Sequence, residues 1–319
     1  MFLSRASSIV FFFLFFISLE GISQIYRANA WKKYRKEVGI QIGASGFLGD
    51  LGGRNISGTD YSPVDLEPNA TRVALGLSYR YKCTKEINVL TSFNYLLLSG
   101  DDKLTQEKYR NNRNLNFKTN LYEIGARVEF SLTSMKQSGI YNLKRHLSKT
   151  KKRRYNELIA FVGVAGYYFN PMGKNPYTDE WVNLYNLHTE GQGLPGGPKQ
   201  YKKIGVSIPV GLALRTVINK TWSIGAEVNY RITFTDYLDD VSTTYYDKTA
   251  LANAYGTTSA LMSDPSKGDI PTATSPNADG TGAQRGDKNK DSYMSVQITI
   301  GRLIRSKRSG GRTKIRSKF

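Results

Sequence analysis

The sequence predicts an all-β fold, namely an eight-stranded antiparallel transmembrane β-barrel with long outer loops. Three observations support this prediction. A short apolar block near the N-terminus is typical of an exported chain. Apolar residues then recur at every second position in eight separate segments, which is the period of a β-strand. Long and short connections alternate along most of the chain, as they do in outer-membrane barrels.

The N-terminal region has the layout of a secretory signal peptide. Arg5 precedes an apolar block from Ile9 to Ile17, and the small residues Gly21 and Ser23 follow it. The block is shorter than the roughly 20 residues that a membrane-spanning helix needs, so a retained anchor is the less favoured alternative. We expect residues 1–23 to be a signal peptide that is cleaved after Ser23.

The first four expected strands lie in the N-terminal half of the chain. The fourth shows the alternation clearly, because Ile124 and Val128 fall on one face and Glu123 and Arg127 on the other. Successive side chains of a strand point to opposite sides of the sheet, so one face of each strand is apolar. These four segments are residues 38–42, 73–81, 87–98 and 115–132.

The other four expected strands lie in the C-terminal half. In the first of them apolar residues occupy both faces, which leaves its inward side open. Eight is the smallest even number of strands that closes an outer-membrane barrel, and it is the size of the small OmpA and OmpX barrels. The segments are residues 158–169, 206–215, 222–234 and 294–300, and the whole barrel is expected to span 38–304.

Charged residues gather on the face of these strands that lies opposite the apolar face. A soluble barrel fills its interior with apolar side chains, whereas a barrel that faces lipid can point charges inward and pair them. Side chains fill an interior of eight strands, which predicts a plugged barrel and disfavours a diffusion channel; a soluble β-sandwich is the other alternative. We expect Glu227 and Arg231 each to pair with Arg127, Glu129 or Arg215. The expected interior charges are Arg127, Glu129, Arg215, Glu227 and Arg231.

Connection lengths set the expected orientation. In outer-membrane barrels the periplasmic turns are short and the outer loops long, and both termini lie in the periplasm. The connection at 132–157 is the exception, because it falls on the periplasmic side and is long; we expect a basic periplasmic insert there. The long extracellular loop 235–291 is expected to be either a flexible lid or a folded cap. The other long connections are 49–71, 99–114 and 170–204, and the short ones are 82–86 and 217–221.

The net charge of +19 is concentrated on the expected periplasmic side. That side comprises an N-terminal arm (24–37), the insert and a C-terminal tail (305–319). Counted over 25–37, 132–156 and 305–319, these segments hold 20 of the 45 Lys and Arg residues, with Glu37 as their one acid. The rest of the chain holds 25 basic and 25 acidic residues. The charge pattern therefore predicts a polarised molecule.

Three basic segments at one rim favour a docking surface over a merely solvated tail. Expected partners are the headgroups of outer-membrane lipids, peptidoglycan carboxylates or an acidic periplasmic protein. Nucleic acid is not expected, since the runs lack interleaved aromatic residues and an exported barrel meets little of it. The candidate partner-binding residues are Lys144, Arg145, Lys149, Lys151, Lys152, Arg153, Arg154, Arg305, Lys307, Arg308 and Arg312.

Several longer motifs resemble the PorG family of outer-membrane β-barrel components of the type IX secretion machinery. The resemblance implies a barrel associated with the periplasmic ring built by the PorK lipoprotein and PorN, with a role in assembling or anchoring the secretion apparatus. The basic insert and tail are not among these motifs. The motifs are "GFLGDLGG" (46–53), "LLSGDDKLT" (97–105), "YFNPMG" (168–173), "LHTEGQGLPGGPKQY" (187–201), "TFTDYLDDVSTTYYD" (233–247) and "RGDKNKDSY" (285–293).

Two motifs raise the question of a bound ligand. "GQGLPG" has the glycine spacing of a dinucleotide site, but no strand-to-helix turn surrounds it, and we expect a rigid loop that needs positive φ at Gly191, Gly193 and Gly196. "DYLDD" at 236–240 could bind calcium through its aspartates. Its spacing does not match a calcium loop, so a structural role is favoured. No cofactor is expected.

An outer-membrane enzyme, such as a protease or acyltransferase, is the main alternative function, and a general envelope-stabilising barrel unrelated to secretion is the other. His146 and His188 are the only histidines and are expected on opposite sides of the membrane, so no His-paired nucleophile or two-histidine metal site can form. The remaining catalytic set would be His188, Glu190 and the aspartates of 236–240. Cys83 is the single cysteine, which excludes an intramolecular disulfide. We therefore expect a non-catalytic scaffold in the outer membrane.

Overall fold

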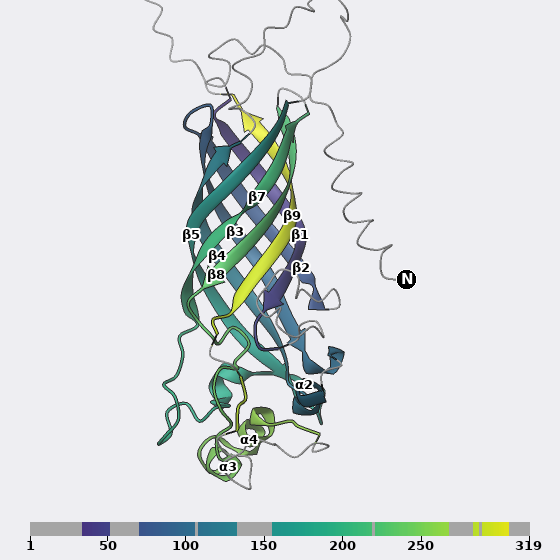
Figure 1. The fold of residues 1–319 in the computed structure, drawn as a ribbon, viewed down its shortest axis with the longest axis vertical. Coiled ribbons are helices and arrows are strands. Elements are labelled where there is room, and N and C mark those ends of the chain that lie inside the picture. The colour runs from purple at the N-terminus through teal and green to yellow at the C-terminus, as the bar shows by residue number, and fades with distance from the viewer. Residues whose placement is uncertain are drawn as a thin grey trace, which may run out of the picture.

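The computed structural model describes residues 34–51, 70–105, 108–132, 155–218, 221–267, 283–286 and 289–305. Within them, eight long strands form a closed antiparallel β-barrel, which confirms the fold expected from the sequence (Figure 1). Neighbours pair in the order β4-β3-β2-β1-β9-β8-β7-β5, and the pairing of β4 with β5 closes the ring. The strands are β1 (Lys36–Leu48), β2 (Arg72–Lys82), β3 (Ile87–Asp101), β4 (Asn116–Ser131), β5 (Tyr155–Lys174), β7 (Ile204–Val217), β8 (Trp222–Thr233) and β9 (Ser292–Ile304).

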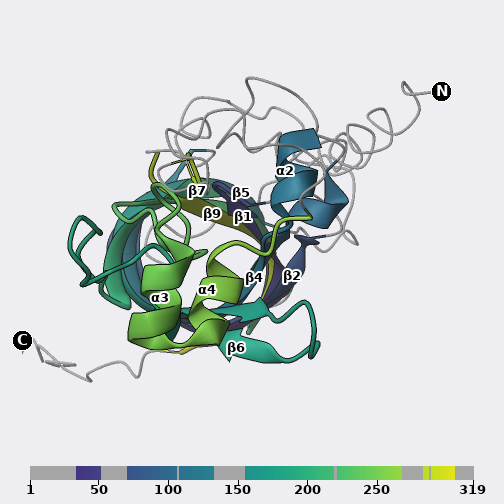
Figure 2. The same ribbon diagram turned by 90° about the horizontal axis from the view of Figure 1, so that it is seen from below.

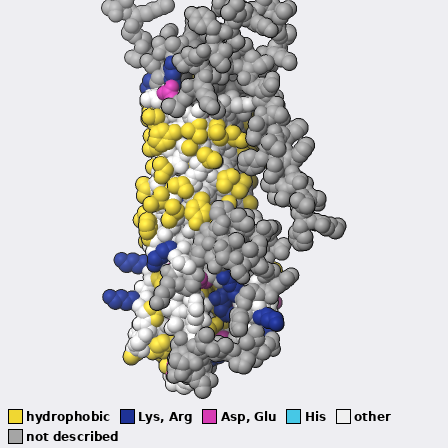
Figure 3. Space-filling view, viewed as in Figure 1, with side chains coloured by type: hydrophobic (Ala, Val, Ile, Leu, Met, Phe, Trp, Pro, Cys, Tyr) yellow, Lys and Arg dark blue, Asp and Glu magenta, His cyan; other side chains and the backbone are white. Residues whose placement is uncertain are grey.

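The outer and inner faces of the barrel wall differ in polarity, as strand alternation requires. On β1, Ile40 is 57% exposed whereas the next residue, Gln41, is 1% exposed. On β8, Val228 is exposed and Glu227 is buried. Figure 3 shows the outcome as a belt of apolar side chains on the visible face of the barrel, with Lys and Arg side chains beyond it. A continuous apolar surface of this kind marks contact with a membrane or a protein.

The two ends of the barrel are built differently. At the end where β1 begins and β9 ends, here called the terminal end, β2 and β3 are joined by a short turn. At the opposite end, the connections are long and fold into a cap. In Figure 1 the tilted strands run from the terminal end at the top to the cap at the bottom. All the connections expected to be outer loops therefore lie at one end.

Short helices and one extra strand form the cap. The strand β6 (Trp181–Asn183) pairs with the last residues of β5, beyond the ring. Seen from below in Figure 2, α3 and α4 lie across the barrel end, and α2 lies to one side. The helical elements are η4 (Asp102–Leu104), α2 (Lys108–Arg113), η6 (Leu184–Leu187), α3 (Lys248–Tyr255) and α4 (Thr257–Ser263).

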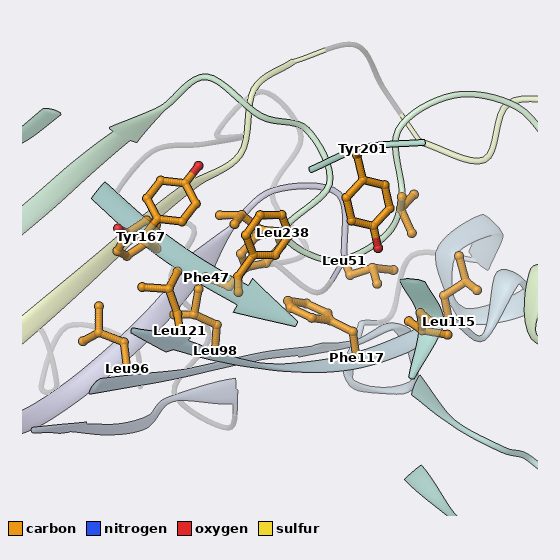
Figure 4. Close-up of a cluster of buried hydrophobic side chains, with 14 of the residues drawn as sticks. Phe47, Leu51, Leu96, Leu98, Leu115, Phe117, Leu121, Tyr167, Tyr201 and Leu238 are labelled. Atoms are coloured by element: carbon orange, nitrogen blue, oxygen red, sulfur yellow. The ribbon is translucent and has the colours of Figure 1, made fainter. Parts of the chain in front are cut away.

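A hydrophobic cluster joins the cap to the barrel (Figure 4). It combines inward residues near the cap end of the strands, such as Phe117 and Phe169, with cap residues such as Leu238, which is fully buried. Tyr201 stacks between two aromatic rings, 6.1 Å from Phe169 and 4.7 Å from Tyr237 between centroids. The described part of 235–291 is therefore a folded cap rather than a flexible lid.

The loop "GQGLPG" is rigid in the way the sequence predicts. Gly191, Gly193 and Gly196 have φ of 73°, 87° and 81°, a region that side chains with a Cβ rarely enter. The ring of Tyr246 packs directly against Gly191, where no Cβ would fit. These glycines therefore shape a tight cap loop.

Several strand boundaries differ from those expected, and two of them change the assignment of interior charges. β1 begins at Lys36 rather than Val38, and β5 begins at Tyr155 rather than Leu158. Glu37 was assigned to the N-terminal arm and Glu157 to the insert, but both are inward-facing strand residues, 4% and 1% exposed. At the start of each strand an exposed polar residue, Lys36 on β1 and Asn156 on β5, interrupts the outward apolar alternation that defines the strand.

Much of the expected basic periplasmic surface lies outside the described residues. This applies to the signal peptide 1–23, most of the N-terminal arm, the insert from 133 to 154 and the tail from 306. Of the candidate partner-binding residues, Arg305 alone is described, and it is exposed at the end of β9. Among the described residues, no helix combines the length and the apolar character that crossing a membrane demands.

Candidate functional site

The interior of the barrel contains a chain of ion pairs near the terminal end, here called the barrel network. Its members alternate in sign, so that each guanidinium lies between two carboxylates, and Lys82 ends the chain. Inward residues of neighbouring strands lie side by side, so the network can pass from strand to strand. Its members come from six strands, namely β1, β2, β4, β5, β7 and β8. In order of contact, the members are Lys82, Glu157, Arg215, Glu37, Arg80, Glu129, Arg127 and Glu227.

The contacts of the barrel network are close. Arg127 Nη2 lies 2.6 Å from Glu227 Oε2 and 3.1 Å from Glu129 Oε1. Arg80 Nε lies 2.6 Å from Glu129 Oε2, and its Nη1 lies 3.1 Å from Glu37 Oε1. These arginines bridge strands that are far apart in the sequence, and they hold the wall together by charge-assisted hydrogen bonds.

A second, smaller charged group lies nearer the cap. Arg231 is fully buried and donates from Nε to Glu123 Oε2 at 3.1 Å, while the Tyr293 hydroxyl donates to the same oxygen at 2.7 Å. Asn94 also donates to Glu123, at 2.9 Å. Glu227 pairs with Arg127, as expected. The expectation that Arg231 pairs with one of the other expected interior charges is wrong, since Glu123 is the acid at its level of the barrel.

The structure thus places all five expected interior charges inside the barrel, none more than 9% exposed. Sequence reasoning singled out neither Arg80 nor Glu123 as an interior charge. Both lie at inward positions of their strands, because Arg80 follows the outward Tyr79 on β2 and Glu123 precedes the outward Ile124 on β4. The alternation of inward and outward positions was therefore the signal that could have identified them.

Side chains fill the barrel at the terminal end. The void that remains there has a volume of about 20 Å³, and its lining includes Glu37, Arg80, Glu157 and Arg215. This volume admits no more than a water molecule. The interior is plugged at this level by its own ion pairs.

The cap encloses a second buried charged region, here called the acidic core. Its two cations are Arg113 and Arg285, which approach each other because Arg113 Nη1 donates to the Arg285 carbonyl at 2.6 Å. Among the described residues, its buried carboxylates outnumber these cations. They are Asp50, Asp102, Glu190, Asp236, Asp239, Asp240 and Asp291.

Glu190 is the most heavily bonded of these acids. Arg285 Nη1 donates to its Oε1 at 3.1 Å, and the backbone N–H groups of Ser242 and Thr243 donate to the same oxygen. The Thr243 hydroxyl donates to Oε2 at 2.8 Å. Both oxygens are occupied, so Glu190 ties three cap segments together.

Asp102 and Asp240 are held by different partners. Arg113 donates to both oxygens of Asp102, at 2.7 and 2.9 Å. Asp240 accepts from the hydroxyls of Thr189 at 2.6 Å and Tyr201 at 2.7 Å. Burial raises the pKa of Asp240 to about 6, although Arg285 lowers it in part.

Asp239 and Asp291 are less well satisfied. Each accepts one backbone N–H, from Val241 at 3.0 Å and from Leu238 at 2.8 Å. Burial and the neighbouring carboxylates hold the pKa of both well above the ordinary range. Asp236 accepts from the Ser242 hydroxyl at 2.6 Å.

The "DYLDD" aspartates are thus buried in the cap. In the described part of the chain, no group of three or more His, Cys, Asp or Glu side chains is arranged to hold a metal ion. The calcium site considered for 236–240 has no support in this arrangement.

The residues proposed for the alternative enzyme do not form a catalytic arrangement. The His188 ring stacks on Tyr255, 4.2 Å between centroids, and His188 directly follows the end of η6. Glu190 is saturated by donors, as described above. His146 lies outside the described residues. General acid–base chemistry needs groups that can reach a substrate, and these carboxylates are buried in the cap.

Most of the motifs that carry the family resemblance meet in the cap. "GFLGDLGG" supplies Asp50, "LLSGDDKLT" supplies Asp102, and "LHTEGQGLPGGPKQY" supplies Glu190. "TFTDYLDDVSTTYYD" and "RGDKNKDSY" contribute the remaining aspartates and Arg285. The resemblance is thus concentrated in segments that build the acidic core.

Comparisons with known proteins do not assign a function. Residues 13–163 match a family described as Domain of unknown function (DUF6089). No curated protein matches the chain.

Three solved structures are similar to this chain. Ail of Yersinia pestis is 10% identical with a TM-score of 0.34, covering 85% of this chain and 99% of Ail. The N-terminal barrel of Pseudomonas aeruginosa OprF is 8% identical with a TM-score of 0.32, covering 85% and 99%. Neisserial surface protein A is 7% identical with a TM-score of 0.30, covering 84% and 97%. Likeness of this degree carries no information on function.

Proposed function

We propose that the protein is an outer-membrane barrel that serves as a non-catalytic scaffold. The observation that carries this proposal is the apolar belt on a closed barrel whose interior is filled by paired charges. A closed barrel satisfies every backbone group within its wall, so it can face hydrocarbon without an unpaired edge. A plugged interior fits a scaffold better than a pore.

We further propose that the scaffold helps assemble or anchor the type IX protein secretion machinery. The motifs shared with PorG-like barrels support this function, and the basic segments at the terminal end support a docking surface there. In this proposal the insert, the arm and the tail form a basic collar that binds the periplasmic ring of PorK and PorN type. Arg305 is the described residue that begins the tail, and it is exposed.

Charge reversal within the insert tests the proposed collar. The variant replaces Lys151, Lys152, Arg153 and Arg154 with Glu, because single exposed pairs contribute only about 0.2–1 kcal/mol. We expect the barrel to insert normally while co-purification with the ring weakens and cargo secretion falls. The difference from wild type should shrink as salt is raised, because salt screens the exposed charges.

A matched control makes the same change in charge at the cap end. It replaces the exposed residues Lys108, Lys199, Lys202 and Lys290 with Glu. The control should leave ring binding and secretion unchanged. Normal ring binding by the insert variant would refute the collar and place any contact elsewhere on the barrel.

The orientation is tested separately with inserted protease sites. Gly256 lies between α3 and α4, and its φ of 93° and open surroundings suit an insertion. A site at Gly256 should be cut on intact cells, and one at Ser148 only after the outer membrane is breached. Cleavage at Ser148 on intact cells would contradict the orientation.

A further inference from the structure

Among the described residues, the acidic core of the cap holds more buried carboxylates than cations. Among the described residues, seven buried carboxylates share the guanidinium groups of Arg113 and Arg285. Arg113 is already bidentate on Asp102, and Arg285 pairs with Glu190. An ionised carboxylate that is buried without a counter-charge is so costly that it normally takes up a proton. The core therefore has carboxylates that need neutralising.

Asp239 and Asp291 are the clearest candidates for protonation. Both are 0% exposed, and each uses one oxygen to accept a backbone N–H. The other oxygens, Asp239 Oδ2 and Asp291 Oδ1, have no hydrogen-bond partner among the described groups. A proton on either residue would turn such an oxygen into a donor.

The charges around these two residues come from several cap segments. Asp50, which follows β1, and Asp236, which follows β8, act on both residues with the same negative sign. Arg113 on α2 acts on Asp239 with the opposite sign. Asp239 itself acts on Asp291. The negative neighbours outnumber the positive one, so the surroundings favour the neutral acids.

We propose that protons hold the cap closed: Asp239 and Asp291 are carboxylic acids in the closed cap, and the cap loosens when the surrounding pH rises enough to ionise them. Ionisation adds negative charge in a space that excludes water, where repulsion between carboxylates is strong. A divalent cation is the other way to neutralise such a core. The described side chains are not arranged for one.

Loosening of the cap would change the surface at that end of the barrel. Tyr201 and Tyr237, which stack within the cap, would lose their cover. The proposal thus gives the cap a pH-dependent apolar surface, independently of any role at the terminal end.

The direction of the pH effect follows from proton uptake. The closed cap binds protons that the open cap releases, because the carboxyl pKa values are raised only in the closed form. Closure is therefore most favourable at low pH and weakens as pH rises through the closed-form pKa values. Each proton involved changes the closed-to-open ratio about tenfold per pH unit within that range.

Hydrogen–deuterium exchange of the full-length protein in detergent micelles tests this proposal. Peptides covering 236–263 report on the cap, and peptides of β4 serve as the reference, with correction for the pH dependence of intrinsic exchange. From about pH 5 to about pH 9, we expect cap protection to fall at least tenfold over one pH unit while β4 protection stays constant. Cap protection that is independent of pH would overturn the proposal.

Two further experiments, on variants and with added cations, distinguish neutralisation by protons from neutralisation by a bound cation. Asp239→Asn combined with Asp291→Asn mimics the neutral acids and should keep the cap protected at high pH. Glu227→Gln, in the barrel network, should leave the cap response unchanged. If calcium restores protection at high pH and EDTA removes it at low pH, the core is a cation site and the proposal fails. The wild-type titration decides the matter even if the double variant does not fold.

Discussion

The barrel interior and the cap bury charged side chains to a similar degree, yet they differ in charge balance: the described cations match the carboxylates in the barrel but not in the cap. In the barrel strands, five buried carboxylates face four arginines and Lys82, and every one of them is in an ion pair. In the cap, seven buried carboxylates face Arg113 and Arg285. The barrel interior is neutral as built, whereas the described part of the acidic core holds more carboxylates than cations.

This difference reflects how the two regions are made. Strand register fixes which inward residues meet, so Arg127 and Glu227 can pair across the barrel although 100 positions separate them. The cap is made of connections whose acids accept backbone N–H and hydroxyl groups, as Asp291 and Asp240 do. Such bonds hold a loop in shape without cancelling its charge. The barrel network therefore suits a fixed plug, and the acidic core suits a part that responds to its surroundings.

Replacing Arg285 with Met should have the largest effect, because it removes one of the two cations of the acidic core. Breaking a buried pair by removing one partner costs about 3–5 kcal/mol, and here both Glu190 and Asp240 lose an attractive charge. We expect the cap to unfold at neutral pH while the barrel persists, as measured by amide exchange in each region. Lys290→Met, at an exposed position, is the control. An intact cap in the Arg285 variant would mean that the acidic core needs no counter-charge.

Truncating Glu227 should have the next largest effect, and on the barrel alone. Arg127 would keep Glu129 as a partner, so we expect a loss near the lower end of about 3–5 kcal/mol for Glu227→Ala. Glu227→Gln retains a hydrogen-bond acceptor and should lose less. The measurement is the temperature at which the barrel loses its heat-modifiable gel migration. Equal migration of both variants and wild type would show that the barrel network adds no stability.

A change at Asp240 should alter the pH dependence of the cap more than its stability. Its carboxyl pKa is raised to about 6, so its contribution is fully present below the ordinary Asp pKa of about 3.9 and is lost as pH rises through about 6. Asp240→Asn should flatten cap stability between these values, at a cost of about 1 kcal/mol for the altered bonds to Thr189 and Tyr201. Thermal melts of the cap at several pH values check this. An unchanged slope would assign the pH response to other groups.

The contrast also explains what the sequence could predict. Alternation predicts the strands and puts Arg127 and Glu227 inside, because each inward position follows from its neighbours. The same reasoning missed Glu37 and Glu157 at the strand ends, where few apolar positions remain to show which residues face inward. It left the cap undecided, since no periodic pattern tells that Asp50, Glu190 and Arg285 meet. Contacts between loops depend on the closed barrel that brings the loops together.

Breaking an exposed ion pair of the cap should have the smallest effect, in contrast to breaking a buried pair of the acidic core. Lys248 Nζ lies 2.5 Å from Asp264 Oδ2, and the lysine side chain is 50% exposed. Because water and salt screen this pair, Lys248→Ala should cost the cap only about 0.2–1 kcal/mol, and the loss should shrink as salt is added. The Arg285 variant should depend far less on salt, since its partners are shielded from solvent. Comparing the two variants in low and high salt by cap exchange separates surface charge from the acidic core. An equal salt dependence would mean that solvent reaches the core even in the closed cap.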